Sequence, residues 1–269
     1  MTTPPPTPSA SAPGRRALLT GASSGIGAAL ALELGRRGVS LWLGARRLDR
    51  LATLVDEIQA AGGKAKAMTL DVVDAAACAR AVVAVDEDAG GLDIVIANAG
   101  VGGKSPSLWD IDVDDAVATI GTNFTGALAT ILPLLPRMRA RGRGQIVGIS
   151  SLAADLAQPG APVYGATKAA FSFFLDSIAP ELAAAGIDVT IVHPGFVKSE
   201  MTGKNKFDMP FLVETKDAAR LIADAIDARR AWLRFPWQLS TTMSLANLVP
   251  RGLRASIVLR QLKANATRA

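Results

Sequence analysis

RALLTGASSGIG, residues 16–27, decides the fold of this chain. An apolar strand is followed by a turn with glycine at positions 21, 25 and 27, and then by a helix that we expect over about 26–37. Glycine permits a tight turn and a close backbone approach to a phosphate, and a helix N-terminus offers free amides and a positive dipole end. The order strand, turn, helix predicts a dinucleotide-binding loop of Gly21, Ser23, Ser24, Gly25, Ile26 and Gly27.

Apolar runs and helical patterns alternate along the rest of the chain. We expect further strands near 39–44, 65–70, 92–97, 145–150 and 187–192, and helices near 48–61, 74–88, 113–132 and 162–185. Strands that are apolar throughout and alternate with helices are typical of a parallel sheet covered on both faces. The sequence therefore predicts a single α/β domain over residues 15–230. We expect a doubly wound, Rossmann-like sheet that binds ligands at the carboxyl ends of its strands.

The two ends of the chain differ in composition from this core. Residues 1–14 carry no charge and no apolar block, which predicts a disordered tail and not a signal peptide. Residues 228–269 hold eight basic residues and no acidic one. We therefore predict that residues 231–269 form a basic amphipathic extension of the same domain, largely helical.

Two interpretations of this extension stay open. Aromatic residues joined to a basic amphipathic helix suit peripheral contact with an anionic membrane surface. The same segment could instead pack on the protein or across a subunit interface. Nucleic-acid binding is not expected, because no recognised binding motif accompanies the charge. No apolar run reaches the ~18 residues of a transmembrane helix.

Cysteine and histidine each occur once, as Cys78 and His193. One cysteine excludes an internal disulfide and favours a reducing, cytoplasmic compartment. Neither residue stands in a metal-ligand spacing, so no metal site is expected. His193 ends an apolar run just before Pro194 and Gly195, and we interpret it as a strand-end residue without a catalytic role.

A second group of polar residues lies in the C-terminal half. Tyr164 and Lys168 are four residues apart, which places them on one face of a helix, and Ser151 lies thirteen residues before the tyrosine. An ammonium beside a phenol favours the phenolate, so we expect the pKa of Tyr164 to fall from about 10 toward neutrality. Such a tyrosine can exchange a proton with an alcohol or carbonyl oxygen. A surface helix pair would give the same spacing.

The residues after the second strand indicate which nicotinamide cofactor the protein binds. NAD sites usually place an acidic residue there to bind the ribose 2′-hydroxyl, but residues 38–48 contain none. Arg46 and Arg47 stand there instead, and their guanidinium groups suit a 2′-phosphate. The sequence therefore favours NADP, although two solvated arginines would fit the same pattern.

Taken together, these residues resemble the short-chain dehydrogenase/reductase family in its shorter, single-domain branch, over roughly residues 16–230. The resemblance rests on Thr20-Gly-x-x-x-Gly-x-Gly27, Asp71, Ala97-Asn98-Ala99-Gly100, Asn123, Ser151, Tyr164-x-x-x-Lys168 and Pro194-Gly195. Two positions depart from the family pattern. Ala97 replaces a commoner asparagine, and Ser199 replaces the threonine usual near the nicotinamide carboxamide.

The resemblance implies a role for each motif. Asp71 and Val72 would contact the adenine, and Asn98, Ala99 and Gly100 would line the adenosine and nicotinamide-ribose side of the cleft. Pro194, Gly195, Val197 and Ser199 would lie by the nicotinamide. Lys168 would also bind the ribose hydroxyls. Asn123 would distort its helix and hold a water that links Lys168 to solvent, while Ser151 would bind the reacting oxygen together with Tyr164.

The expected function is an NADP-dependent oxidoreductase that interconverts a ketone or aldehyde and an alcohol, with Tyr164 as the acid/base. Three segments, 101–107, 152–163 and 196–211, would shape the substrate site, and their apolar content favours an apolar small molecule. The resemblance also implies a homo-oligomer. The alternative is a nucleotide-sensing or membrane-surface docking protein that kept this fold and lost turnover.

Overall fold

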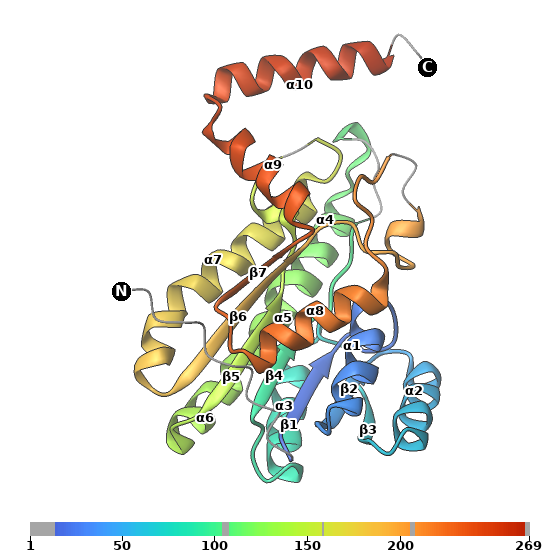
Figure 1. Cartoon of the computed structure of the whole chain (residues 1–269), viewed down its shortest axis with the longest axis vertical. Helices are drawn as coiled ribbons and strands as arrows, with labels where there is room; N and C mark the ends of the chain where they lie inside the picture. The colour runs from blue at the N-terminus through green and yellow to red at the C-terminus, as the bar shows by residue number, and fades with distance from the viewer. Residues whose placement is uncertain (1–13, 104–107, 158, 205–207, 267–269) are drawn as a thin grey trace.

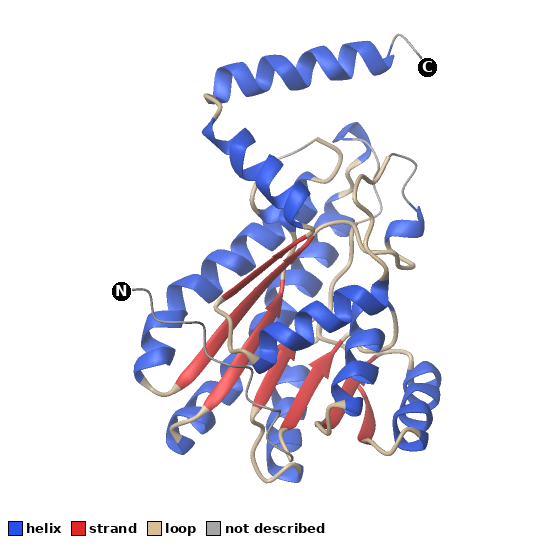
Figure 2. Cartoon of the chain, in the orientation of Figure 1, coloured by secondary structure: helices blue, strands red, loops and turns tan. Residues whose placement is uncertain are grey.

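The described residues of the computed structural model are 14–103, 108–157, 159–204 and 208–266, and their strands form one seven-stranded sheet. Every strand pairs in parallel with its neighbours (Figure 2), and the order of the strands is β3-β2-β1-β4-β5-β6-β7. The strand order reverses next to β1, as in a doubly wound fold. The strands are β1 Arg16–Thr20, β2 Ser40–Ala45, β3 Lys64–Thr69, β4 Ile94–Ala97, β5 Gly144–Ile149, β6 Ile187–Pro194 and β7 Trp232–Phe235.

Helices cover both faces of this sheet (Figure 1). One face packs against α1 Gly25–Arg36, α2 Leu48–Ala60 and α8 Thr215–Asp227. The other packs against α3 Ala75–Asp88, α5 Gly126–Ile131, α6 Leu135–Arg141 and α7 Pro162–Ala184. Successive strand residues point to opposite faces, so Leu18 lies in one core and Leu19 in the other. The predicted Rossmann-like α/β fold is thus confirmed.

Residues 113–141 form a helical run of changing geometry. α4 Val113–Ile120 passes into a π-helix at Gly121–Thr125, then into α5, a 3₁₀ turn at Leu132–Leu134, and α6. The run is long and apolar enough to cross a membrane by length and composition. Its inner side chains, Ile131, Leu134 and Met138 among them, are fully buried against the sheet.

The C-terminal segment departs from the sequence-based expectation. Residues 232–235 form β7, which pairs with β6 and belongs to the sheet. α9 Trp237–Leu248 follows, and α10 Arg251–Ala266 extends away from the body of the molecule (Figure 1). The apolar side chains of α10 are not gathered on one face: Leu253 and Ile257 share a face, but Leu259 points elsewhere. A helix that lies in a bilayer interface needs one apolar face.

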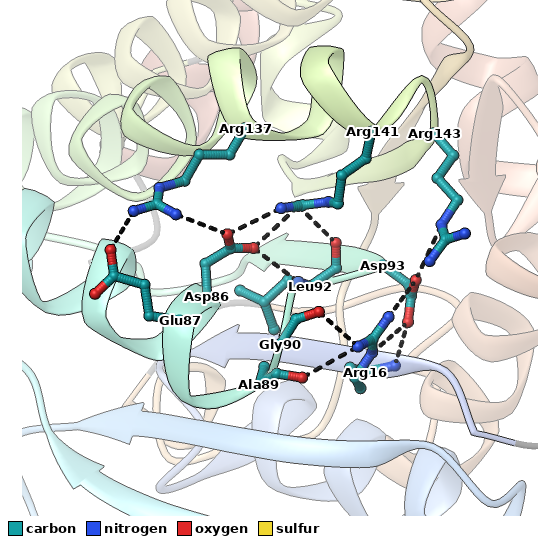
Figure 3. A network of polar contacts seen from close by, with 10 residues as sticks. All are labelled: Arg16, Asp86, Glu87, Ala89, Gly90, Leu92, Asp93, Arg137, Arg141 and Arg143. Carbon is teal, nitrogen blue, oxygen red and sulfur yellow. Dashed lines mark hydrogen bonds and ion pairs between the residues drawn. The ribbon is translucent and has the colours of Figure 1, made fainter.

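A cluster of charged side chains links the helices and strands at the end of the sheet where β4 begins (Figure 3). Asp86, 2% exposed at the end of α3, lies 2.9 Å from Arg141 and 3.4 Å from Arg137, and it accepts a hydrogen bond from the Leu92 backbone N–H at 2.7 Å. The two arginines come from α6. This cluster therefore ties α3, α6 and the start of β4 to one another.

The tail predicted over residues 1–14 lies almost entirely outside the described residues.

Candidate active site

The predicted site residues gather at the carboxyl ends of the central strands. β1 ends at Thr20, β4 at Ala97, β5 at Ile149 and β6 at Pro194, and the polar motifs follow directly after each. Because these strands are parallel and adjacent, their ends meet at one edge of the sheet, where an α/β fold binds its ligands.

The glycine-rich turn leaves no room for side chains at two of its positions. A Cβ at Gly21 would lie 2.7 Å from the Ala99 Cα, and one at Gly27 would lie 2.3 Å from the Gly21 carbonyl oxygen. Gly25 has φ +55°, a backbone conformation that glycine adopts without strain. Ser24 begins α1 without a side-chain cap, so the first amides of a twelve-residue helix stay available to an anion.

Asn98 holds this loop from the neighbouring strand. Its side-chain amide donates to the carbonyl oxygens of Thr20, at 2.9 Å, and Gly21, at 3.2 Å. The Thr20 hydroxyl accepts from the backbone N–H groups of Asn98 and Ala99. Thr20 was quoted in the motif but not predicted as a site residue. It supports the loop by joining β1 to β4.

The structure distinguishes the two arginines after β2. Arg47 extends over the glycine-rich loop and donates to the hydroxyls of Ser23 and Ser24, the shorter contact being 2.7 Å to Ser24. It also pairs with Glu200 at 3.1 Å. Arg46 is exposed to solvent. Of the two predicted phosphate ligands, Arg47 is the one that contacts the loop.

Asp71 and Val72 follow β3 at the same edge. The Asp71 carboxylate accepts a hydrogen bond from the Val73 backbone N–H at 3.1 Å and is otherwise open to solvent. The N-cap of α3 is Asp74, whose carboxylate accepts from the Ala77 backbone N–H. Val72 is buried against Gly126, where a Cβ would lie 2.7 Å away. Asp71 therefore has an acceptor oxygen available at the site.

Tyr164, Lys168 and Ser151 meet where α7 passes the end of β5. The Ser151 hydroxyl lies on the side of Tyr164 and lowers the pKa of its hydroxyl. The Ser151 Oγ accepts from the Ala153 backbone N–H at 3.1 Å and lies 3.5 Å from the Pro194 carbonyl oxygen. The Lys168 ammonium lies 5.9 Å from the centre of the tyrosine ring and donates to the Ile149 carbonyl oxygen at 2.8 Å. The neighbouring Ser150 points away from this group, toward the Lys168 backbone carbonyl.

Burial changes the proton affinity of the Tyr164 and Lys168 side chains. It raises the pKa of Tyr164, and Ser151 opposes this rise. It lowers the pKa of Lys168 from 10.5 to about 8. The direction for Tyr164 is opposite to the one expected from the sequence. Desolvation of the phenolate outweighs the attraction of an ammonium that lies beyond contact distance.

Asn123 occupies the middle of the π-helix. Its side-chain oxygen accepts from the Val101 backbone N–H at 2.8 Å, and its amide donates to the Val101 carbonyl oxygen at 2.9 Å and to the Thr167 hydroxyl at 3.1 Å. Gly100 lies between Asn123 and Lys168, since a Cβ there would be 3.3 Å from each side chain. Asn123 thus joins the 98–101 segment to α7. Thr167 was not predicted.

The segment after β6 closes the site. Gly195 donates its N–H to the Phe235 carbonyl oxygen at 2.7 Å, and a Cβ on it would lie 2.9 Å from Leu239. Val197 is buried, and its carbonyl oxygen accepts from the Thr202 hydroxyl. Ser199 faces Gly25, with 3.4 Å between its Cβ and the position of a Gly25 Cβ.

These observations fit a dinucleotide. The loop admits a pyrophosphate because side chains are excluded at Gly21 and Gly27, and α1 presents uncapped amides beside it. The fold and the site therefore define a nucleotide-binding α/β protein with a tyrosine, a lysine and a serine at the end of its cleft.

Comparison with known proteins agrees with a nucleotide-binding α/β protein and identifies its family. The model of the short chain dehydrogenase family matches residues 15–209. An uncharacterized oxidoreductase of Myxococcus xanthus is 46% identical over 239 residues, which are 89% of this chain and 94% of the relative. Gluconate 5-dehydrogenase of Gluconobacter oxydans is 35% identical over 74% of this chain and 77% of its own length. The chain belongs to the short-chain dehydrogenase/reductase family and is an oxidoreductase of that family.

Solved structures show the same architecture. A short-chain dehydrogenase from Sphingobium yanoikuyae in complex with NADPH superposes with a TM-score of 0.78 at 28% identity, over 90% of this chain and 95% of its own. One from Burkholderia phymatum in complex with NAD gives a TM-score of 0.80 at 25% identity, over 87% and 93%. The family uses nicotinamide cofactors, and its members differ in which one they bind.

Proposed function

We propose that this protein is an NADP-dependent oxidoreductase that interconverts a ketone or aldehyde and the corresponding alcohol. The observation that carries the proposal is the grouping of Ser151, Tyr164 and Lys168, the last one helical turn after the tyrosine, at the strand edge that also carries the glycine-rich loop. A panel of ketones and alcohols tested with NADPH and NADP, followed at the nicotinamide absorbance band, tests it directly. No turnover with any carbonyl or alcohol would favour a nucleotide-sensing role.

The side chains divide the proton chemistry between them. A bound nicotinamide supplies or takes up the hydride. Tyr164 donates its proton to the carbonyl oxygen in reduction and accepts one from the alcohol in oxidation. Ser151 donates a hydrogen bond to the same oxygen and stabilises the charge that grows there in the transition state. Because burial raises the pKa of Tyr164, the phenol is protonated at neutral pH, which favours reduction there and oxidation at higher pH.

The proposed substrate is apolar. A Cβ on Gly102 would lie 3.6 Å from the Met201 Cγ, so the segments after β4 and β6 approach each other. Met201 and Phe211, both in the segment after β6, expose 43% and 51% of their surface. Residues 104–107, 158 and 205–207 of the three proposed substrate segments lie outside the described residues. An apolar lining with a few polar groups at the reacting end is typical of small-molecule sites.

Arg47 should determine the preference for NADPH over NADH. Its guanidinium lies over the phosphate loop, and a charge-assisted contact is worth about 1.5–3 kcal/mol. Arg47→Ala should therefore lower the ratio of kcat/KM values for NADPH and NADH by about tenfold or more. Arg46→Ala is the matched control and should change the ratio less. A wild type that prefers NADH would overturn the argument from the missing acidic residue, and a larger effect at Arg46 would reverse the assignment.

Lys168→Met should stabilise the folded protein at pH 7. The pKa of Lys168 is about 8 when folded and 10.5 in the reference state, so the unfolded chain binds more protons between these values. The wild type therefore gains stability as pH rises from about 8 to 10.5, whereas the variant does not. The difference in unfolding free energy between the wild type and Lys168→Met should change by on the order of 3 kcal/mol between pH 7 and pH 11. Denaturant titrations at several pH values measure it, and a difference independent of pH would contradict the buried, charged lysine.

We also propose a homodimer in the cytoplasm. α4 exposes Val113, Val117 and Ile120, which share a face by their spacing, and α7 exposes 77% of Phe173. A groove lined by Ile120, Phe124, Pro162 and Val163 lies between these helices. A second copy would cover this surface. Val117→Asp should shift the sedimentation coefficient to that of a monomer, and an unchanged assembly would exclude this face.

For the C-terminal extension two alternative roles are proposed: packing against protein, or contact with a membrane surface. α10 spreads its apolar side chains around the helix, as noted above, and this distribution favours packing against protein over an interfacial position. Flotation with anionic vesicles, with and without residues 251–269, separates the two.

A further inference from the structure

The only histidine of the chain lies behind the active site. His193 is the last residue of β6 but one, and 1% of its surface is exposed. Its Nε2 lies 2.9 Å from the Ser172 Oγ, and its Nδ1 lies 2.8 Å from the Asp155 Oδ1. The carboxylate is out of line for a linear hydrogen bond from Nδ1, so this contact is chiefly electrostatic. The Trp232 ring packs edge-on against the imidazole, with 5.1 Å between centroids.

Ser172 connects this histidine to the catalytic lysine. Its Oγ lies 2.9 Å from the Lys168 carbonyl oxygen and 2.7 Å from the Ser150 Oγ. The Ser150 Oγ is itself 3.0 Å from the same carbonyl. Both serines are buried, so their hydroxyl groups have these partners in place of solvent.

The number of hydroxyl and imidazole protons in this cluster limits which of these hydrogen bonds can form at the same time. A serine hydroxyl donates one hydrogen bond. If His193 Nε2 accepts that bond from Ser172, the Lys168 carbonyl is bound by Ser150. If Nε2 carries a proton, its N–H donates a hydrogen bond to the Ser172 Oγ, and the Ser172 hydroxyl is then free to donate to the Lys168 carbonyl oxygen. The state of the imidazole therefore decides which serine holds the Lys168 backbone.

Asp155 favours the first arrangement. Its carboxylate lies beside Nδ1 and attracts a proton to that nitrogen, which leaves Nε2 as an acceptor. Arg234 of β7 lies 3.2 Å from the other carboxylate oxygen and balances its charge. On the other side, the cluster reaches the backbone carbonyl of Lys168 through Ser172 on α7.

We propose that His193 is a positioning residue for the reaction, and that the chain Asp155–His193–Ser172 fixes the backbone at Lys168. The cluster joins three segments of the site. Ser150 and Asp155 flank Ser151 and the 3₁₀ turn Leu152–Ala154, His193 precedes Pro194 in β6, and Ser172 lies one turn after Lys168 in α7. Correct placement of Lys168 and Tyr164 depends on all three. The inference rests on the proposed function of the Tyr164 site.

Nitrogen-15 NMR of the imidazole tests the relay without any assay of activity. With one histidine in the chain, a sample free of an affinity tag gives a single pair of ring nitrogen signals. We expect the wild-type pair to report a proton on Nδ1 with Nε2 as the acceptor, and Ser172→Ala to move the Nε2 signal. A protonated Nε2 in the neutral ring, or no change in the variant, would overturn the proposal.

Steady-state kinetics test the positioning role. His193→Phe and Ser172→Ala should each lower kcat about tenfold and leave the KM for NADPH within about twofold, and the double variant should be no worse than either one. His193→Gln should recover much of kcat, because its amide oxygen can accept from Ser172. Additive losses, an effect confined to KM, or no recovery with glutamine would overturn the relay.

The two proposals fail in different ways. Full turnover in Tyr164→Phe would remove the proposed catalytic function, while the tautomer measurement would still report on the relay. An Nε2-protonated ring would remove the relay and leave the role of Tyr164 untouched.

Discussion

Tyr164→Phe is expected to lower kcat by about 10²–10⁴-fold, the usual contribution of general acid–base catalysis. The substitution removes the hydroxyl that exchanges the proton, whose pKa Ser151 lowers. The ring stays, so packing at the start of α7 is kept. Cofactor affinity, measured by quenching of tryptophan fluorescence, should change little, because the hydroxyl serves the substrate oxygen.

Two companion variants sharpen this experiment. Ser151→Ala should cost less than Tyr164→Phe, since it removes one donor to the oxygen but leaves the proton source. Lys168→Met should weaken cofactor binding as well as turnover, because the ammonium is also assigned to the ribose. Near-normal kcat in Tyr164→Phe would be incompatible with the proposed mechanism.

Asp86→Ala is expected to cost about 3–5 kcal/mol of unfolding free energy, the range for breaking a buried ion pair. The carboxylate is almost fully buried and serves two arginines of α6 and the Leu92 amide (Figure 3). Removing it leaves the Leu92 amide without its partner and takes the carboxylate away from Arg141, whose remaining bond is to the Leu92 carbonyl oxygen. Urea unfolding followed by circular dichroism measures the loss.

Asp88→Ala is the matched control. Asp88 lies two residues further along α3, is half exposed, and pairs with Lys66 on the surface. Exposed ion pairs contribute little, so this variant should unfold close to the wild type. A similar loss in both variants would show that the burial of Asp86 is not what makes it important. Turnover per folded molecule should be unchanged in each, since both lie at the opposite end of the sheet from the active site.

Much of the fold could be predicted because its strands are buried on both faces. Such strands are continuous apolar runs, and the six predicted ones match β1 to β6 within two residues at each end. β7 was missed because it has four residues, includes the exposed Arg234 and is followed by Pro236. Its position comes from pairing with β6, which local sequence does not reveal. α8 has a regular apolar pattern and could have been found from Ile222 and Ile226.

In the candidate site too, some features could be predicted from the sequence and others could not. The motif residues could be located from spacing, since Tyr164 and Lys168 share a helix and the glycines share a turn. Which of Arg46 and Arg47 contacts the glycine-rich loop could not be predicted, because the two neighbouring arginines differ only in the direction of their side chains. The pKa of Tyr164 was expected to fall, but it rises, because burial depends on the whole fold. The cluster of Asp155, Ser172 and His193 spans separate elements and has no sequence pattern.

β7 also sets the order in which the protein can be completed during synthesis. About 40 residues separate its start from the end of β6, and translation at 5–20 residues per second makes this interval on the order of 2–8 s. During this interval the outer edge of β6 has no partner, and His193 has neither Trp232 nor the Arg234–Asp155 pair beside it. The nascent chain can form its nucleotide-binding half early. The support behind the lysine is assembled only when β7 emerges.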